Sequence, residues 1–69
     1  MSKFLDFVRR EEKLWVVMNR RHDFPLGFIY FYTVWGKWVF EPHDSTVYDS
    51  ECLRDIADFI KGLGGGSSG

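Results

Sequence analysis

The stretch FIYFYTVWGKWVF, residues 28–40, places seven aromatic side chains in thirteen positions and constrains the fold more than any other part of the chain. Gly36 and Lys37 interrupt it, and a two-residue loop that begins with glycine is typical of a type II′ turn. The residues on either side therefore predict a β-hairpin in which Trp35 pairs with Trp38.

This register divides the hairpin side chains between two faces of a sheet, because successive residues of a strand point to opposite sides. The more apolar face carries Ile29, Phe31, Thr33, Trp35, Trp38 and Phe40. The other face carries Phe28, Tyr30, Tyr32, Val34, Val39 and Glu41. We expect a helix to pack on the first face, which leaves the tyrosine face for another cover.

The residues that follow the hairpin predict this helix. Asp49 or Ser50 can cap its start, and Gly62 or Gly64 can end it. Apolar side chains recur between them at helical spacing, at Cys52, Leu53, Ile56, Phe59, Ile60 and Leu63. Residues 64–69 have the composition of a Gly/Ser linker or an added tail.

Two segments precede the hairpin. LWVVMNRR, residues 14–21, alternates with period two and predicts a strand packed on both faces, and HDFPLG connects it to the next strand. After Ser2, apolar or long side chains recur at helical spacing, at Phe4, Phe7, Val8 and Glu11. This spacing predicts a short N-terminal helix.

The expected fold is therefore α+β, with a three-stranded antiparallel meander, a C-terminal helix packed on one face and a short N-terminal helix. A short fourth strand at residues 46–48, TVY, is left open. We assign residues 1–63 to a single small domain. Such a chain buries only about 60% of its unfolded surface, and its one cysteine, Cys52, excludes an internal disulfide. Large aromatic side chains remain as the means of building a core.

Charge and hydropathy exclude several classes of protein. The formal net charge of −1 argues against a dedicated nucleic-acid binder. No apolar run approaches the ~20 residues that span a bilayer, and the N-terminus lacks the apolar core of a signal peptide. We therefore expect a cytoplasmic protein that does not bind membranes.

The order α-β-β-β-α and the length resemble the double-stranded-RNA-binding domain, which holds phosphates with lysines at the start of its last helix. Here that helix begins DSECLRD, which would repel phosphates. WGKWVFEP with TVYDSECLRDIA resembles the plant ERF DNA-binding domain over a minor part of the chain. Where that family has several arginines, this chain offers only Lys37. In both cases, the residues with which the family contacts nucleic acid are missing from this chain.

The candidate partner-binding residues are expected on the tyrosine face or at its rim: Trp15, Arg20, Arg21, Tyr30 and Tyr32. Such a surface suits a protein partner or a second copy of the chain. Aromatic side chains with a basic rim are also the ingredients of a nucleic-acid platform, which is the alternative function. Against it, Glu41 lies on the same face, and tyrosines also suit the edge of a small core that the first helix covers.

No set of residues predicts an enzyme, a cofactor or a metal site. Cys52 lies near the first turn of the last helix, where the helix dipole lowers a thiol pKa, but it falls on the apolar stripe. We therefore expect a buried structural cysteine. His43 and Asp44 lack a recognised metal-ligand spacing, and Gly27 and Gly36 stand alone at predicted turns.

The class that remains is a small non-enzymatic protein-interaction module of the inhibitor or adaptor type, such as bacteria and phages encode. The expected sheet has two faces and one long helix. Its aromatic second face must therefore be covered by the N-terminal helix, by a second copy or by a partner.

Overall fold

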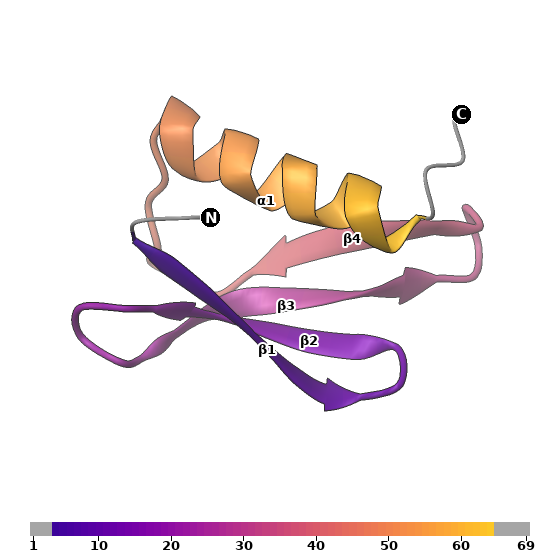
Figure 1. Cartoon of the computed structure of the whole chain (residues 1–69), viewed down its shortest axis with the longest axis horizontal. Helices are drawn as coiled ribbons and strands as arrows, with labels where there is room; N and C mark the ends of the chain where they lie inside the picture. Colours follow the sequence, from indigo (N-terminus) through magenta and orange to yellow (C-terminus); the bar gives the residue numbers. More distant parts are fainter. Residues whose placement is uncertain (1–3, 65–69) are drawn as a thin grey trace.

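The computed structural model describes residues 4–64 and shows one antiparallel sheet with a helix on one side (Figure 1). The elements are β1 (Leu5–Glu11), β2 (Leu14–Asn19), β3 (Pro25–Tyr32), β4 (Lys37–Pro42) and α1 (Ser50–Leu63), and the strand order is β1-β2-β3-β4. The α+β class, the antiparallel meander and the C-terminal helix are thus confirmed. Ser2, where the first helix was predicted to begin, and residues 65–69 of the predicted tail lie outside the described residues.

The predicted N-terminal helix is wrong, because residues 5–11 form β1. Leu5 and Phe7 face α1, whereas Val8, the residue after Phe7, pairs with Val16 and points to the other side of the sheet. This segment fits both a helical and a strand period, and a short isolated helix is marginal in water. Pairing along β2 decides in favour of the strand.

The fourth strand is therefore β1, and the short strand that the sequence left open at residues 46–48 does not form. These residues form an irregular connection between β4 and α1. The Tyr48 hydroxyl donates a hydrogen bond of 2.7 Å to the Leu26 carbonyl, and its ring packs edge-on against Phe40. The Tyr48 side chain thus fixes this connection to the sheet, and no backbone strand pairing is involved.

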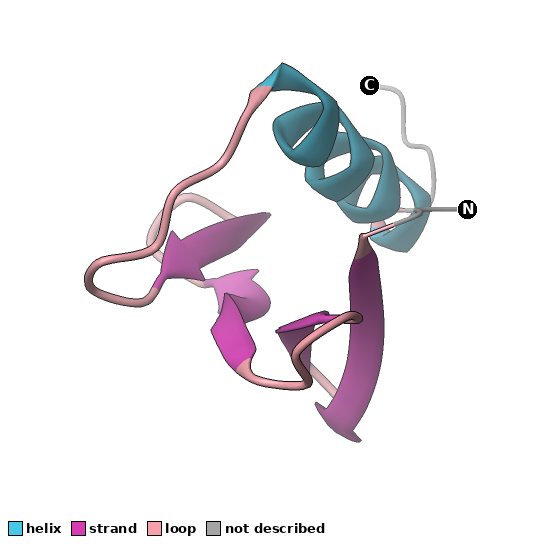
Figure 2. Cartoon of the chain, turned by 90° about the vertical axis from the view of Figure 1, so that its left-hand side faces the viewer, coloured by secondary structure: helices cyan, strands magenta, loops and turns pink. Residues whose placement is uncertain are grey.

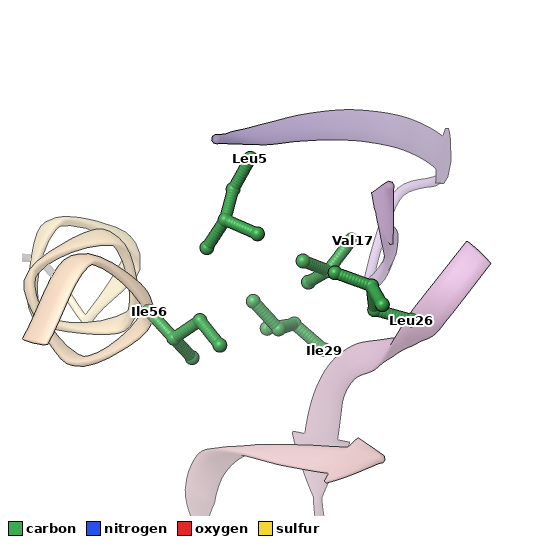
Figure 3. Packing of buried hydrophobic residues seen from close by; sticks show 5 residues of the cluster. All are labelled: Leu5, Val17, Leu26, Ile29 and Ile56. Carbon is green, nitrogen blue, oxygen red and sulfur yellow. The ribbon is translucent and has the colours of Figure 1, made fainter. Parts of the chain in front are cut away.

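The core lies between α1 and the sheet and consists of Leu5, Val17, Leu26, Ile29 and Ile56 (Figure 3). Val17 and Ile29 are fully buried. A bulge leaves Leu26 between Pro25, which pairs with Met18, and Gly27, which pairs with Val17, and the Leu26 side chain lies in the core. Each of the four strands and the helix thus surrounds this cluster, with β4 contributing the partly buried Trp38 and Phe40.

The hairpin of β3 and β4 is present, but its predicted turn and register are wrong. Phe31 pairs with Trp38 and Tyr32 with Lys37, so the loop has four residues, 33–36. The Tyr32 carbonyl accepts a 2.8 Å hydrogen bond from the Gly36 amide, and Gly36 has φ 64°. Because the register moves by an even number of residues, the side chains that stay in the strands keep their predicted faces.

The helix α1 begins and ends as its sequence predicts. The Asp49 carboxylate caps the first turn by accepting a 2.9 Å hydrogen bond from the Cys52 amide, and the Gly64 amide bonds to the Ile60 carbonyl. Ile56 is buried, but Leu53, predicted within the apolar stripe, is 51% exposed. Among the described residues, no helix is both long and apolar enough to cross a membrane.

Candidate functional site

The sheet face opposite α1, which we call the open face, is not covered by the helix. Figure 2 shows α1 on one side of the curved sheet only. The strand registers place on the open face Val8, Leu14, Val16, Met18, Phe28, Tyr30, Tyr32, Val39 and Glu41. The β1 strand extends this face as an edge strand; it does not cover it, as an N-terminal helix would have done.

An apolar row crosses the open face. Val8 in β1 pairs with Val16 in β2, and Val16 pairs with Phe28 in β3. Val8 is 42% exposed, whereas Val16, between two neighbouring strands, is only 8% exposed. The row is therefore most accessible at the outer edge of β1.

The middle of the open face is hollowed into a depression of about 580 Å³. It is lined by Arg10, Glu11, Leu14, Val16, Met18, Pro25, Phe28 and His43. The His43 ring forms one wall, with its edge against the Phe28 ring at 5.0 Å between centroids. Most of the lining residues are apolar, and Arg10 and Glu11 bring one charge of each sign from the end of β1.

The tyrosines occupy the end of the open face nearest the β3–β4 loop. The Tyr30 hydroxyl donates a 2.9 Å hydrogen bond to Oε1 of Glu41, and this bond raises the pKa of Tyr30. Tyr32 packs edge-on against Trp35, with centroids 5.1 Å apart. Trp35 was predicted on the helix side, but it belongs to the loop and is 66% exposed.

The structure brings Tyr30 and Tyr32 together on one face but separates them from Trp15. Trp15 pairs with Ile29 and meets the Phe59 ring edge-on at 4.9 Å, so it lies on the helix side of the sheet. The prediction that it neighbours the tyrosines is wrong. The alternation along residues 14–19 was correct, but the face depends on the register with β3.

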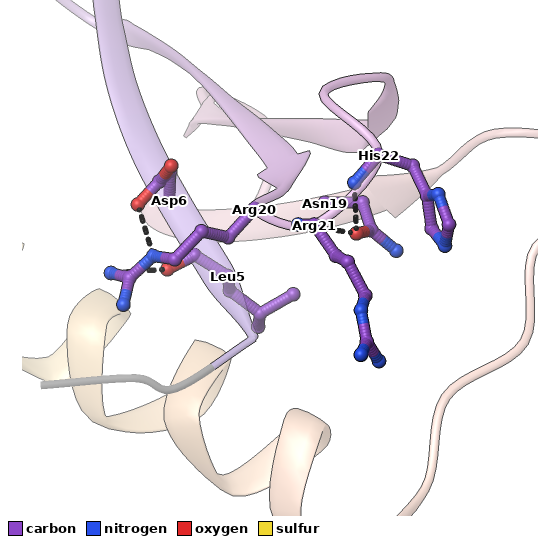
Figure 4. Close-up of polar contacts among 6 residues, drawn as sticks. All are labelled: Leu5, Asp6, Asn19, Arg20, Arg21 and His22. Carbon is purple, nitrogen blue, oxygen red and sulfur yellow. Dashed lines mark hydrogen bonds and ion pairs between the residues drawn. The ribbon is translucent and has the colours of Figure 1, made fainter.

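The predicted basic rim also lies away from the tyrosines. Tyr30 pairs with Leu14 at the start of β2, whereas Arg20 follows the end of β2, roughly 20 Å away at 3.3 Å per residue. Arg20 Nε binds Asp6 Oδ1 at 2.9 Å, and Arg21 extends from the same turn (Figure 4). The two arginines therefore do not border the tyrosine end of the face.

Cys52 contacts the hydrophobic core and is half-buried. Burial raises the pKa of its thiol, and the hydrogen bond with Asp49 adds to the increase. This direction is opposite to that of an activated thiolate. Within residues 4–64, no group of three or more His, Cys, Asp or Glu side chains is arranged to hold a metal ion.

Several residues of the open face were not among the partner-binding residues predicted from the sequence, chiefly Val8, Val16, Phe28 and His43. Val8 was assigned to a helix, although the period-two pattern of residues 5–8 was a signal for its outward position. His43 meets Phe28 only because β4 returns beside β3, which no local pattern indicates.

Comparisons with protein-family models, with curated protein sequences and with solved structures give no match for this chain. What the protein does must therefore be inferred from the side chains of the open face.

Proposed function

We propose that the chain is a small non-enzymatic protein-interaction module of the inhibitor or adaptor type, and that it binds an amphipathic helix of a partner protein on its open face. The observation that carries this proposal is the apolar row from Val8 through Val16 to Phe28, beside a depression that α1 does not cover. Val16 itself is buried, but Val8 at one end of the row and the apolar lining of the depression beside it present apolar side chains to solvent, and such a patch rimmed by polar residues marks an interaction site.

A helix is the partner element that suits this surface best. The sheet already packs one helix, α1, on its other face, and layered α/β architectures bury a sheet by covering it with helices. The depression offers Leu14, Met18 and Phe28 to apolar side chains, and methionine adapts to irregular neighbours. One side of an amphipathic helix supplies such apolar anchors at i, i+3, i+4 and i+7.

The charges around the open face favour a protein over a polyanion. Arg10 and Glu11 stand together at one end, and Lys37 and Glu41 stand on β4. Mixed charges can pair with the polar flanks of a helix, whereas carboxylates repel phosphates. These charges therefore favour a partner helix that has an apolar side and charged residues of both signs next to it.

Nucleic-acid binding through Tyr30 and Tyr32 with Arg20 and Arg21 is the weaker alternative. The two tyrosines share a face, but Arg20 is paired with Asp6 at the other end of the sheet. Tyr30 also donates its hydroxyl to Glu41. We expect no single-strand binding tighter than the ~10⁻⁴ to 10⁻⁶ M of non-specific electrostatics at physiological salt.

The test uses a displayed library of amphipathic helical peptides selected against the immobilised chain. The strongest binder is then titrated into labelled protein, and amide shifts are mapped. We expect the shifts to centre on β2 and β3. Replacing Met18 by Glu should abolish binding, whereas Val47→Glu, at a loop valine that is 90% exposed, should leave it unchanged.

Two results would contradict the proposal. One is a selected helix that shifts only α1 or the β3–β4 loop and binds Met18→Glu as tightly as the wild type. The other is submicromolar, salt-sensitive binding of a labelled single strand that disappears in Tyr30→Ala or Arg20→Ala. Thermal unfolding of each variant verifies that a lost interaction is not a lost fold.

A further inference from the structure

We infer that the outer edge of β1 is a self-association seam, on which a second copy of this chain adds its own β1 antiparallel, with Val8 opposite Val8 of the second copy. The resulting sheet is continuous across both molecules. This inference rests on the edge strand and its charges, and it is independent of the helix-binding proposal.

The strand order leaves two sheet edges in the described part of the chain, and they differ in their capacity to pair. On β4, the 2.8 Å bond from the His43 amide to the Leu26 carbonyl fixes the alternation of the ladder. Trp38, Phe40 and Pro42 therefore turn their backbone groups outward. Proline has no amide to donate, and α1 contacts this strand. The β4 edge is thus a poor template for a new strand.

The β1 edge presents a usable backbone ladder. The Arg20 amide donates a 2.9 Å hydrogen bond to the Phe4 carbonyl. Because bonded and non-bonded pairs alternate in an antiparallel ladder, Asp6 and Val8 bond to β2, and Phe7 and Arg9 turn their amides and carbonyls away from it. Such an edge pairs readily with another strand.

Several registers of two antiparallel β1 strands would pair the outward backbone groups of one copy with those of the other, and the charges on β1 favour one of these registers. With Val8 opposite Val8 of the second copy, Asp6 lies opposite Arg10 of the second copy on the same face. The allowed registers differ by two residues. The next register in one direction places Arg9 opposite Arg9 of the second copy, and the second register in the other direction places Asp6 opposite Asp6. The intermediate register opposes Phe7 to Phe7 and leaves Asp6 facing Val8. Opposite charges across strands stabilise a pair and like charges destabilise it, so the Val8-centred register is favoured.

Asp6 remains available for this contact although it already binds Arg20. Its bond to Arg20 involves Oδ1, and the side chains of Arg20 and Asp6 are 44% and 46% exposed. A carboxylate can accept from two guanidinium groups through its two oxygens. Arg10 lines the rim of the open face, so its side chain is on the side where Asp6 lies.

Pairing in this register has a consequence for the open face. The row from Phe28 through Val16 to Val8 continues directly into the same row of the second copy. The exposed Val8 side chain, the most accessible member of the row, is then covered. The bulge between Arg9 and Glu11 ends the regular part of β1 and limits the seam to a short segment.

The test is sedimentation equilibrium of the full chain over a wide concentration range at low salt. The wild type should show a reversible dimer that weakens as salt rises. Arg9→Pro removes an outward amide without disturbing the ladder to β2, and it should remain monomeric with an unchanged circular dichroism spectrum. Val39 lies on the open face of β4, the edge strand at the other side of the sheet. Val39→Glu should therefore dimerise like the wild type, whereas it would weaken a dimer formed by contact between two open faces.

A charge-exchange pair gives the sharpest result. In a self-pair, Arg10→Asp places a second carboxylate opposite Asp6, and Asp6→Arg places a second guanidinium opposite Arg10, so each variant alone should lose dimerisation. In a mixture of the two variants, the heterodimer replaces these like-charge contacts with opposite-charge contacts and should therefore form. A wild type that stays monomeric at every concentration, or variants whose mixture remains monomeric while the wild type dimerises, would overturn the seam. A monomeric wild type would leave the helix-binding titration unaffected.

Discussion

The ring of Phe7 in β1 stacks on the ring of Phe59 in α1, with centroids 4.2 Å apart and planes 5° apart. This contact joins the first strand to the last helix across nearly the whole chain. Trp15 completes the cluster edge-on against Phe59. Burial of this kind gives a chain without a disulfide much of its stability, because each aromatic ring removes a large apolar area from water.

The helix–sheet interface should depend strongly on Ile56. It is 3% exposed and belongs to the buried cluster, so Ile56→Ala should cost roughly 2–5 kcal/mol of unfolding free energy. Leu53→Ala, on the exposed side of the same helix, is the matched control and should change much less. Urea unfolding measures both, and a cost for Ile56→Ala below about half a kcal/mol would place the core elsewhere, since buried deletions cost more than this.

Two glycines should respond oppositely to replacement by alanine. A Cβ on Gly27 would lie 2.5 Å from the Glu41 carbonyl oxygen and 2.8 Å from the Phe40 ring, so Gly27→Ala should destabilise by about 1–3 kcal/mol through overpacking. A Cβ on Gly62 meets nothing within 4 Å. Because Gly62 lies within α1, Gly62→Ala should stabilise by about 0.5–1 kcal/mol. Thermal unfolding that shows the same sign for both would refute this packing.

The cap of α1 should titrate at low pH. The hydrogen bond from the Cys52 amide holds the pKa of Asp49 below its ordinary value of 3.8. Its contribution to stability is therefore fully present above the unfolded-state pKa and is lost as pH falls through the folded-state pKa. Asp49→Asn keeps an oxygen acceptor without this titration. The stability difference between wild type and variant should shrink below about pH 4, and a difference constant down to strongly acidic pH would contradict the cap.

Cys52 should react slowly with a thiol reagent in the native protein at neutral pH. Burial raises the pKa of its thiol, so little thiolate is present, and the side chain is packed against the core. The same chain in denaturant should react rapidly. Fast labelling of the native protein would indicate an activated thiolate and would return an enzymatic function to consideration.

The sequence predicted an element correctly where its local spacing and its packing in the fold agree. The stripe around Ile56 predicted α1, and the face assignment of β3 and β4 survived a wrong turn because the register error was even. Phe7 and Val8 show where local spacing fails. Their positions fit a helix equally well, and what decides is contact with Phe59 and Val16, which lie far along the chain. The face of Trp15 likewise depended on its pairing with Ile29.

The candidate site was predictable only in part for the same reason. Tyr30 and Tyr32 share a face by strand alternation alone. Their neighbours on that face come from β1, β2 and β4 through registers that a bulge and a four-residue loop determine. Arg20 was close to the strand in sequence, but the antiparallel return of β3 places it at the opposite end of the sheet from Tyr30.

The measurement that tests the central claim most directly is relaxation of methyl signals by a soluble nitroxide in a dilute sample. The claim is that the helix covers one face of the sheet and leaves the other open to a partner. The methyls of Val8 and Met18 should then relax strongly, and those of Val17 and Ile29, both fully buried beneath α1, should be protected. Protection of Met18 and Val8 equal to that of Val17 in the monomer would mean that the chain covers this face itself, and it would contradict the proposed binding surface.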